Sequence, residues 1–158
     1  MNSNASPTWG EISRLNSLLD TNVLSEYRKP DANPGVIRFL RGLDFHTTYL
    51  SVVTLSEIRF GAERMPAGRR RQDIEHWLEW DLPLDFRDRI FGIHTDVAQV
   101  AGQVRAKAFN AGRPMGVMDA FIAATADIHG LTVVTRNVRD FEVWGGPVFN
   151  PWTEDPPA

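Results

Sequence analysis

The chain has 158 residues, no cysteine and a formal net charge of -3; this length fits a single domain, and the lack of cysteine excludes disulfides and cysteine-ligated zinc sites. The negative charge excludes binding of nucleic acid by bulk positive potential, although cations held by clustered carboxylates would change the balance locally. No apolar run reaches membrane-spanning length and the first ten residues are polar, so we expect a cytoplasmic protein without membrane contact.

Strand and helix signals alternate along the chain. In chain order, the predicted elements are a strand over residues 18–19, helices over 22–29 and 34–42, a strand over 48–53, helices over 54–65 and 68–81, a strand over 89–93, a helix over 96–111, a turn over 112–116, a helix over 118–129, a strand over 131–135, a turn or short helix over 137–141, and a strand over 148–150. Such alternation predicts an α/β protein whose sheet is mostly parallel and flanked by helices.

Three acidic residues follow predicted strands: Asp20, Glu57 and Asp140. Because the strands of a parallel sheet end at one edge, we expect these three carboxylates to lie there together. Asp119 begins a helix after a turn, and its spacing alone does not bring it to that edge. Clustered carboxylates without cationic partners indicate a bound cation, and an all-oxygen ligand set favours Mg²⁺ or Mn²⁺.

Each acid also has a local explanation that needs no site. Residues 54–57 and 137–140 both have the pattern of a capping box, in which the acid accepts a hydrogen bond from the first backbone N–H of its helix. Asp20 could be a helix N-cap, and Asp119 would be favoured by the dipole of its helix in the first turn. Only the four acids in combination favour a metal site.

Five short motifs occur in order along the chain, and together they resemble the PIN-domain family, most closely its VapC or FitB type. The motifs are Leu19-Asp20-Thr21-Asn22, Ser56-Glu57-Ile58, Met118-Asp119-Ala120-Phe121-Ile122-Ala123-Ala124, Thr135-Arg136-Asn137 with Asp140-Phe141, and Phe149-Asn150-Pro151-Trp152. The resemblance implies a three-layer fold with four or five mostly parallel strands. It also implies a magnesium-dependent ribonuclease that is the toxin of a type II toxin-antitoxin pair, a homodimer, and a small antitoxin whose tail occupies the active site.

Carried onto this chain, the resemblance makes Asp20 and Asp119 the principal metal ligands and catalytic acids, and Glu57 the third. Members of the family place the fourth acid either where Asn137 stands or where Asp140 stands, and we predict that Asp140 has this role. The implied PIN domain spans residues 17–152, with tails over 1–16 and 153–158. A catalytically silent PIN-like module that binds a partner protein or nucleic acid is the alternative function.

Polar and basic residues near these acids are candidates for supporting roles. Thr21, Asn22, Thr135 and Asn137 could orient carboxylates or a water, although turn and cap roles explain them equally well. The possible RNA contacts are Arg136, Arg139 and Arg113. The arginine run over 69–71 is predicted to be exposed, and helical spacing favours core or dimer packing for Trp77 and Trp80 over stacking on bases.

Overall fold

The computed structural model describes residue 11 and residues 14–153, so most of the two predicted tails lies outside the described residues. In the described part, five parallel strands form one sheet in the order β3-β2-β1-β4-β5. The strands are β1 (Ser17–Leu19), β2 (Thr48–Ser51), β3 (Ile90–Phe91), β4 (Thr132–Val134) and β5 (Val148–Phe149). The expected parallel sheet is therefore confirmed. All five strands end at one edge, with β1 in the centre.

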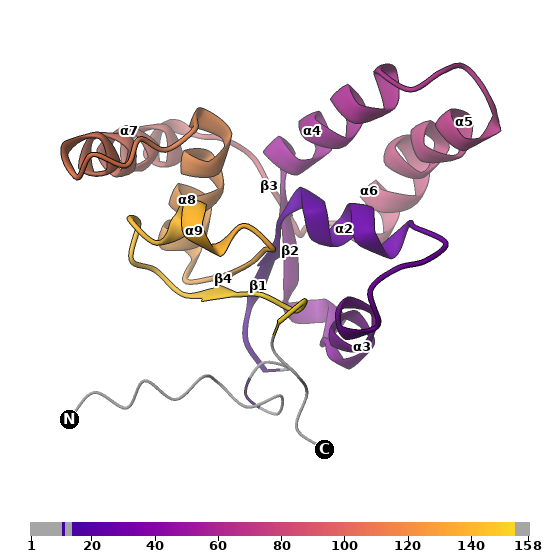
Figure 1. The fold of residues 1–158 in the computed structure, drawn as a ribbon, viewed down its shortest axis with the longest axis horizontal. Coiled ribbons are helices and arrows are strands. Elements are labelled where there is room, and N and C mark those ends of the chain that lie inside the picture. The colour runs from indigo at the N-terminus through magenta and orange to yellow at the C-terminus, as the bar shows by residue number, and fades with distance from the viewer. Residues whose placement is uncertain (1–10, 12–13, 154–158) are drawn as a thin grey trace.

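Helices cover both faces of this sheet, which confirms the three-layer arrangement. They are α2 (Thr21–Tyr27), α3 (Pro34–Gly42), α4 (Val52–Glu63), α5 (Arg69–His76), α6 (Leu82–Asp85), α7 (Thr95–Asn110), α8 (Val117–His129) and α9 (Val138–Phe141), with a 3-10 turn at Phe45–Thr47 and a π-helical turn at Trp77–Asp81. Figure 1 shows α7, α8 and α9 on one side of the sheet and α2, α3, α5 and α6 on the other. Among the described residues, no helix is both long and apolar enough to cross a membrane.

Two hydrophobic cores fill the layers because neighbouring strand residues point to opposite faces. In β1, Leu18 packs into the core that includes residues of α7 and α8, whereas Leu19 packs into the core with residues of α2 and α3. Val133 and Val134 of β4 divide in the same way. All four side chains are at most 2% exposed. The central strands β1 and β4 are thus buried on both faces, which is why consecutive apolar residues precede the edge where each strand ends.

The predicted helix over 54–65 begins earlier, at Val52, and the strand before it ends at Ser51. Ser51 is the N-cap, since its hydroxyl oxygen accepts a hydrogen bond from the backbone N–H of Val53 at 3.1 Å. The β-branched residues Val52 and Val53 follow Ser51, and their preference for strands explains the predicted strand end at residue 53. In the structure these residues begin α4, where Val53 and Thr54 are buried at 5% and 0% exposure and Val52 is 38% exposed.

The predicted single helix over 68–81 is instead α5 followed by a π-helical turn and α6. In this turn the backbone N–H of Leu82 donates to the carbonyl of Trp77, five residues back. Pro83 comes next and has no N–H, so the regular helical bond from residue 83 cannot form. A wider turn just before the proline is the result.

Candidate active site

Asp20 follows β1 directly and is only 6% exposed. It is the N-cap of α2, as its local explanation requires, because Oδ1 accepts a hydrogen bond from the backbone N–H of Thr21 at 2.8 Å. The other oxygen, Oδ2, accepts from Thr135 Oγ1 at 2.7 Å and from Asn22 Nδ2 at 3.2 Å. Burial raises the pKa of Asp20 although these hydrogen bonds oppose the rise. The carboxylate is therefore fixed at the sheet edge in an environment that disfavours its charge.

Thr135, at the end of β4, connects several groups around Asp20. Its buried hydroxyl accepts from Asn22 Nδ2 at 3.1 Å and from the backbone N–H of Asn137 at 3.0 Å, while donating to Asp20. Asn22 in turn accepts from the backbone N–H of Arg136 at 3.1 Å. One network thus joins the start of α2 to the loop after β4, because β1 and β4 are neighbours in the sheet.

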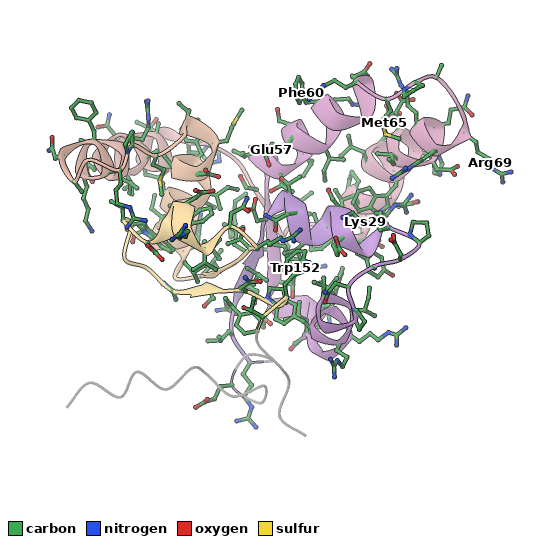
Figure 2. The ribbon with its side chains drawn as sticks, in the orientation of Figure 1. Lys29, Glu57, Phe60, Met65, Arg69 and Trp152 are labelled. Atoms are coloured by element: carbon green, nitrogen blue, oxygen red, sulfur yellow. The ribbon has the colours of Figure 1, made fainter. Side chains whose placement is uncertain are left out.

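Glu57 lies in the second turn of α4, where Figure 2 shows it near the end of that helix closest to the sheet. Its Oε2 accepts a hydrogen bond from Thr21 Oγ1. Burial raises the pKa of Glu57, and the charge of Asp20 adds to the rise. The capping-box explanation of Glu57 is wrong, because α4 begins at Val52 and Ser51 caps it. This carboxylate is turned to the site and does not serve the helix end.

Asp119 lies in the first turn of α8, and it reaches the site because that helix starts at the carboxyl edge of the sheet. Burial raises its pKa to about 6, together with the charges of Asp20, Asp140 and Glu57. All three charges that act on Asp119 are carboxylates. The structure thus brings to the edge the one acid that the strand order could not place there.

Asp140 is exposed on α9, and its charge contributes to the raised pKa of both Asp20 and Asp119. The predicted capping box over 137–140 does not form, since the backbone N–H of Asn137 donates to Thr135 Oγ1. The Asn137 side chain makes no capping bond either. Of the two candidates for the fourth acid, Asp140 is the one whose charge acts on the other carboxylates.

The four acids fit a hard divalent cation in chemical kind. They supply only oxygen ligands, and the charges of Asp20, Asp140 and Glu57 all raise the pKa of Asp119. As the side chains stand, no three histidine, aspartate or glutamate residues within the described part converge closely enough to hold an ion. The structure therefore shows a carboxylate cluster that would favour a cation, and it does not show a closed ligand shell.

Arg113 and Arg136, two of the three predicted RNA contacts, interact with different kinds of side chain. Arg113 forms an ion pair with Glu142 at 2.8 Å. Arg136 is exposed, and its guanidinium carbon lies 5.6 Å from the ring centroid of Trp152. Trp152 belongs to one of the five family motifs, although the sequence alone predicts no role for its ring.

Elsewhere, Trp77 is buried as predicted, whereas Trp80 is 62% exposed and does not join the core. Within the π-helical turn the buried residues are Trp77 and Leu78, and Trp77 joins the core that includes residues of α2 and α3. In the predicted exposed arginine run, Arg69 and Arg70 are exposed, and Arg71 pairs with Glu63 and Glu75.

Together, the fold and the site define an α/β protein with a carboxylate cluster at the carboxyl edge of an all-parallel sheet. A family model described as the PIN domain matches residues 17–144. VapC ribonuclease Y4jK of Sinorhizobium fredii is 36% identical, over 85% of this chain and 96% of that protein. Toxin FitB of Neisseria gonorrhoeae is 37% identical, over 85% and 97%. A crystal structure of FitAcB from Neisseria gonorrhoeae has a TM-score of 0.83 at 36% identity, covering 87% and 99%. The chain therefore belongs to the PIN-domain family, among proteins of the VapC and FitB type.

Proposed function

We propose that this protein is a metal-dependent ribonuclease and the toxin of a toxin-antitoxin pair. The observation that carries the proposal is the carboxylate cluster, in which the charges of three other acids raise the pKa of Asp119. The names of its relatives, a VapC ribonuclease and the toxin FitB, support the same activity and role.

In this proposal Asp20 and Asp119 would hold Mg²⁺ or Mn²⁺. Glu57 and Asp140 are the other two acids of the carboxylate cluster. A divalent cation held by these residues would supply Lewis-acid chemistry, activating water and offsetting negative charge in the transition state. The chain's own contribution is orientation. Thr135 and Asn22 hold one oxygen of Asp20 by the hydrogen bonds described above, and the Thr21 hydroxyl holds Glu57.

The activity is tested by incubating purified protein with total RNA in Mn²⁺ and in EDTA. We expect cleavage in Mn²⁺ that EDTA abolishes and that Asp119→Asn lowers by at least about a hundredfold, because the variant loses one ligand charge. Asp31→Asn is the matched control, since Asp31 is exposed in the loop between α2 and α3. Equal cleavage by Asp119→Asn and the parent at saturating metal would refute the assignment of Asp119. Absence of both cleavage and metal-dependent stabilisation would favour the silent binding module.

The antitoxin is proposed to bind a groove of about 400 Å³ between α2, α4 and α5. The groove opens beside Thr21 and Glu57 and is lined in part by the apolar side chains of Ile58, Ile74 and Trp77. A segment held there would end next to the carboxylate cluster. Ile74→Arg should therefore abolish copurification of the cognate antitoxin from a co-expressing strain, while RNA cleavage by the variant persists. Copurification that is unchanged by Ile74→Arg would exclude this groove.

A homodimer is the remaining partner proposal. Large apolar side chains are exposed at the starts of α4 and α8 and along α4, with Phe60 at 64%, Val117 at 45% and Met118 at 44% exposure. Val117 and Met118 are adjacent in the chain, and neighbouring exposed apolar side chains are typical of a contact surface. Light scattering during gel filtration should give twice the chain mass of 17.8 kDa, and a monomer at micromolar concentration would contradict the proposal.

A further inference from the structure

Both backbone polar groups of Arg136 are hydrogen-bonded to side chains. Its backbone N–H donates to Asn22 Oδ1 at 3.1 Å, and its carbonyl accepts from Asn150 Nδ2 at 3.4 Å. Asn22 also donates to Asp20, so the position of Arg136 is tied to the carboxylate cluster through one side chain. Loop residues on a protein surface rarely have both backbone groups bonded to side chains, since most protein hydrogen bonds are backbone to backbone. This loop residue is therefore placed with unusual definition beside the proposed active site.

The guanidinium of Arg136 is positioned by the chain's last described turn. Asn150, which holds the Arg136 carbonyl, also accepts from the backbone N–H of Trp152 at 3.0 Å through Oδ1. Trp152 packs partly against the core, and Figure 2 shows it near the sheet. The guanidinium carbon lies 5.6 Å from its ring centroid, within the range of a cation-π contact. Asn150 thus fixes the arginine and its aromatic support together.

This guanidinium is not neutralised by a direct ion pair. None of the salt bridges within the described residues includes Arg136. Glu26 is close enough for its pKa to be lowered slightly by Arg136, but the carboxylate of Glu26 is bonded to Lys29 at 2.7 Å and to the backbone N–H of Asn33 at 2.8 Å. The donors of Arg136 therefore remain available to a further acceptor.

We propose that Arg136 binds a backbone phosphate of RNA next to the bond that is cut, and that the Asn150–Trp152 turn builds this phosphate site by holding Arg136 in place. The inference rests on the proposed ribonuclease function. An RNA strand that approaches the carboxylate cluster meets repulsion from several negative charges, and a fixed cation at the rim offsets it. An arginine that is already ordered loses less side-chain entropy on binding than a free one, which favours it for phosphate recognition. Trp152 is a positioning residue in this site.

The test measures RNA binding without cleavage. A fluorescent twelve-nucleotide single-stranded RNA is titrated in EDTA at several salt concentrations, and the affinity is read from anisotropy. Arg136→Ala should weaken binding by about tenfold. It should also reduce the slope of log affinity against log salt by about 0.7, the value for one phosphate contact on a single strand. Arg38→Ala is the control, because Arg38 is exposed on α3 and has no part in the site.

A double-mutant cycle tests the role of Trp152. Trp152→Ala should weaken binding in the parent by about threefold and have no further effect in the Arg136→Ala background, whereas Trp152→Phe should restore most of the affinity. An unchanged salt slope in Arg136→Ala, or equal effects of Trp152→Ala in both backgrounds, would overturn the proposal. So would a loss of antitoxin affinity in Arg136→Ala with RNA affinity unchanged. If the parent bound no RNA in EDTA and cut none in Mn²⁺, the ribonuclease function would fall as well, so the two failures are distinct.

Discussion

The two oxygens of Asp20 have different tasks. Oδ1 caps α2, and Oδ2 is held by Thr135 and Asn22 on the side of the carboxylate cluster. A residue can therefore satisfy its local role and still belong to a site. The N-cap role of Asp20 is confirmed and its role as a metal ligand stays a prediction, while the partners of its second oxygen distinguish it from an ordinary N-cap.

Thr135→Val should lower the free energy of unfolding by about 1–3 kcal/mol, because Asp20, Asn22 and Asn137 each lose a buried hydrogen-bond partner. The variant has nearly the same shape, so packing is retained. Urea denaturation measures the difference. Thr54→Val is the matched control: Thr54 is fully buried and its hydroxyl has no hydrogen-bond partner among the described residues, so this variant should be neutral or more stable. Equal destabilisation by both variants would contradict the role of the Thr135 network.

The raised pKa of Asp119 makes stability depend on pH in the absence of metal. Folding shifts this pKa from 3.8 upward to about 6, so the folded state binds more protons than the unfolded state within that window. The contribution of Asp119 to stability is therefore complete below pH 3.8 and is lost as the pH rises through 6.

Asp119→Asn removes this dependence, and in EDTA above pH 7 the variant should be more stable than the parent. The expected gain is at most about 1 kcal/mol, because solvent screens the charge of this partly exposed carboxyl group. Thermal melts in EDTA at pH 5 and pH 7.5 measure it. A parent that is more stable than Asp119→Asn at pH 7.5 would show that the carboxylates do not repel one another as described.

At the scale of single elements, α4 delivers Glu57 to the site because of where it starts. A helix that began at Thr54 would use Glu57 for its own capping box, whereas a helix that begins at Val52 places Glu57 in its second turn and frees its carboxylate. The hydrogen bond from the backbone N–H of Val53 to Ser51 Oγ, at 3.1 Å, fixes this start.

Ser51→Ala should cost about 1 kcal/mol in the free energy of unfolding, the usual effect of losing an N-cap side chain. It should also weaken metal-dependent cleavage, since the first turn of α4 frays and Glu57 is less well placed. Denaturant unfolding and cleavage rates measure the two effects. Ser25→Ala, at an exposed position on α2, is the control and should change neither. Full stability of Ser51→Ala would refute the observed start of the helix.

Over the whole molecule, the carboxylate cluster joins elements that are far apart in sequence. Asp20 comes from the end of β1, Glu57 from α4, Asp119 from α8 and Asp140 from α9. A cation bound by these acids would link both helical layers across the edge of the sheet. Metal binding and global stability should therefore be coupled.

Mn²⁺ should raise the melting temperature of the parent at pH 7.5. At a concentration one hundred times the dissociation constant, the free energy of unfolding should rise by about 2.7 kcal/mol. Asp20→Asn should lose most of this effect, because Asp20 is the central proposed ligand. Calorimetry with Mn²⁺ and with EDTA measures both proteins. Equal metal stabilisation of the parent and of Asp20→Asn would place the ion elsewhere.

The sequence by itself determined the fold class. It also determined that Asp20, Glu57 and Asp140 follow strands in the chain. Local periodicity and turn residues are sufficient for this, because they depend on neighbours within a few positions. The order of the motifs was also sufficient to indicate the family. Within elements, the sequence placed α3 correctly from residues 34 to 42, since Pro34 and the apolar spacing are both local signals.

Only the tertiary structure decided which side chains meet. Asp119 reaches the cluster because α8 starts at the carboxyl edge, and Arg136 is held because Asn22 and Asn150 lie on either side of it. Contacts of this kind depend on the order β3-β2-β1-β4-β5, in which β1 and β4 are neighbours although more than a hundred residues separate them. No local pattern encodes that order. It follows from packing two helical layers on one sheet, a property of the whole chain.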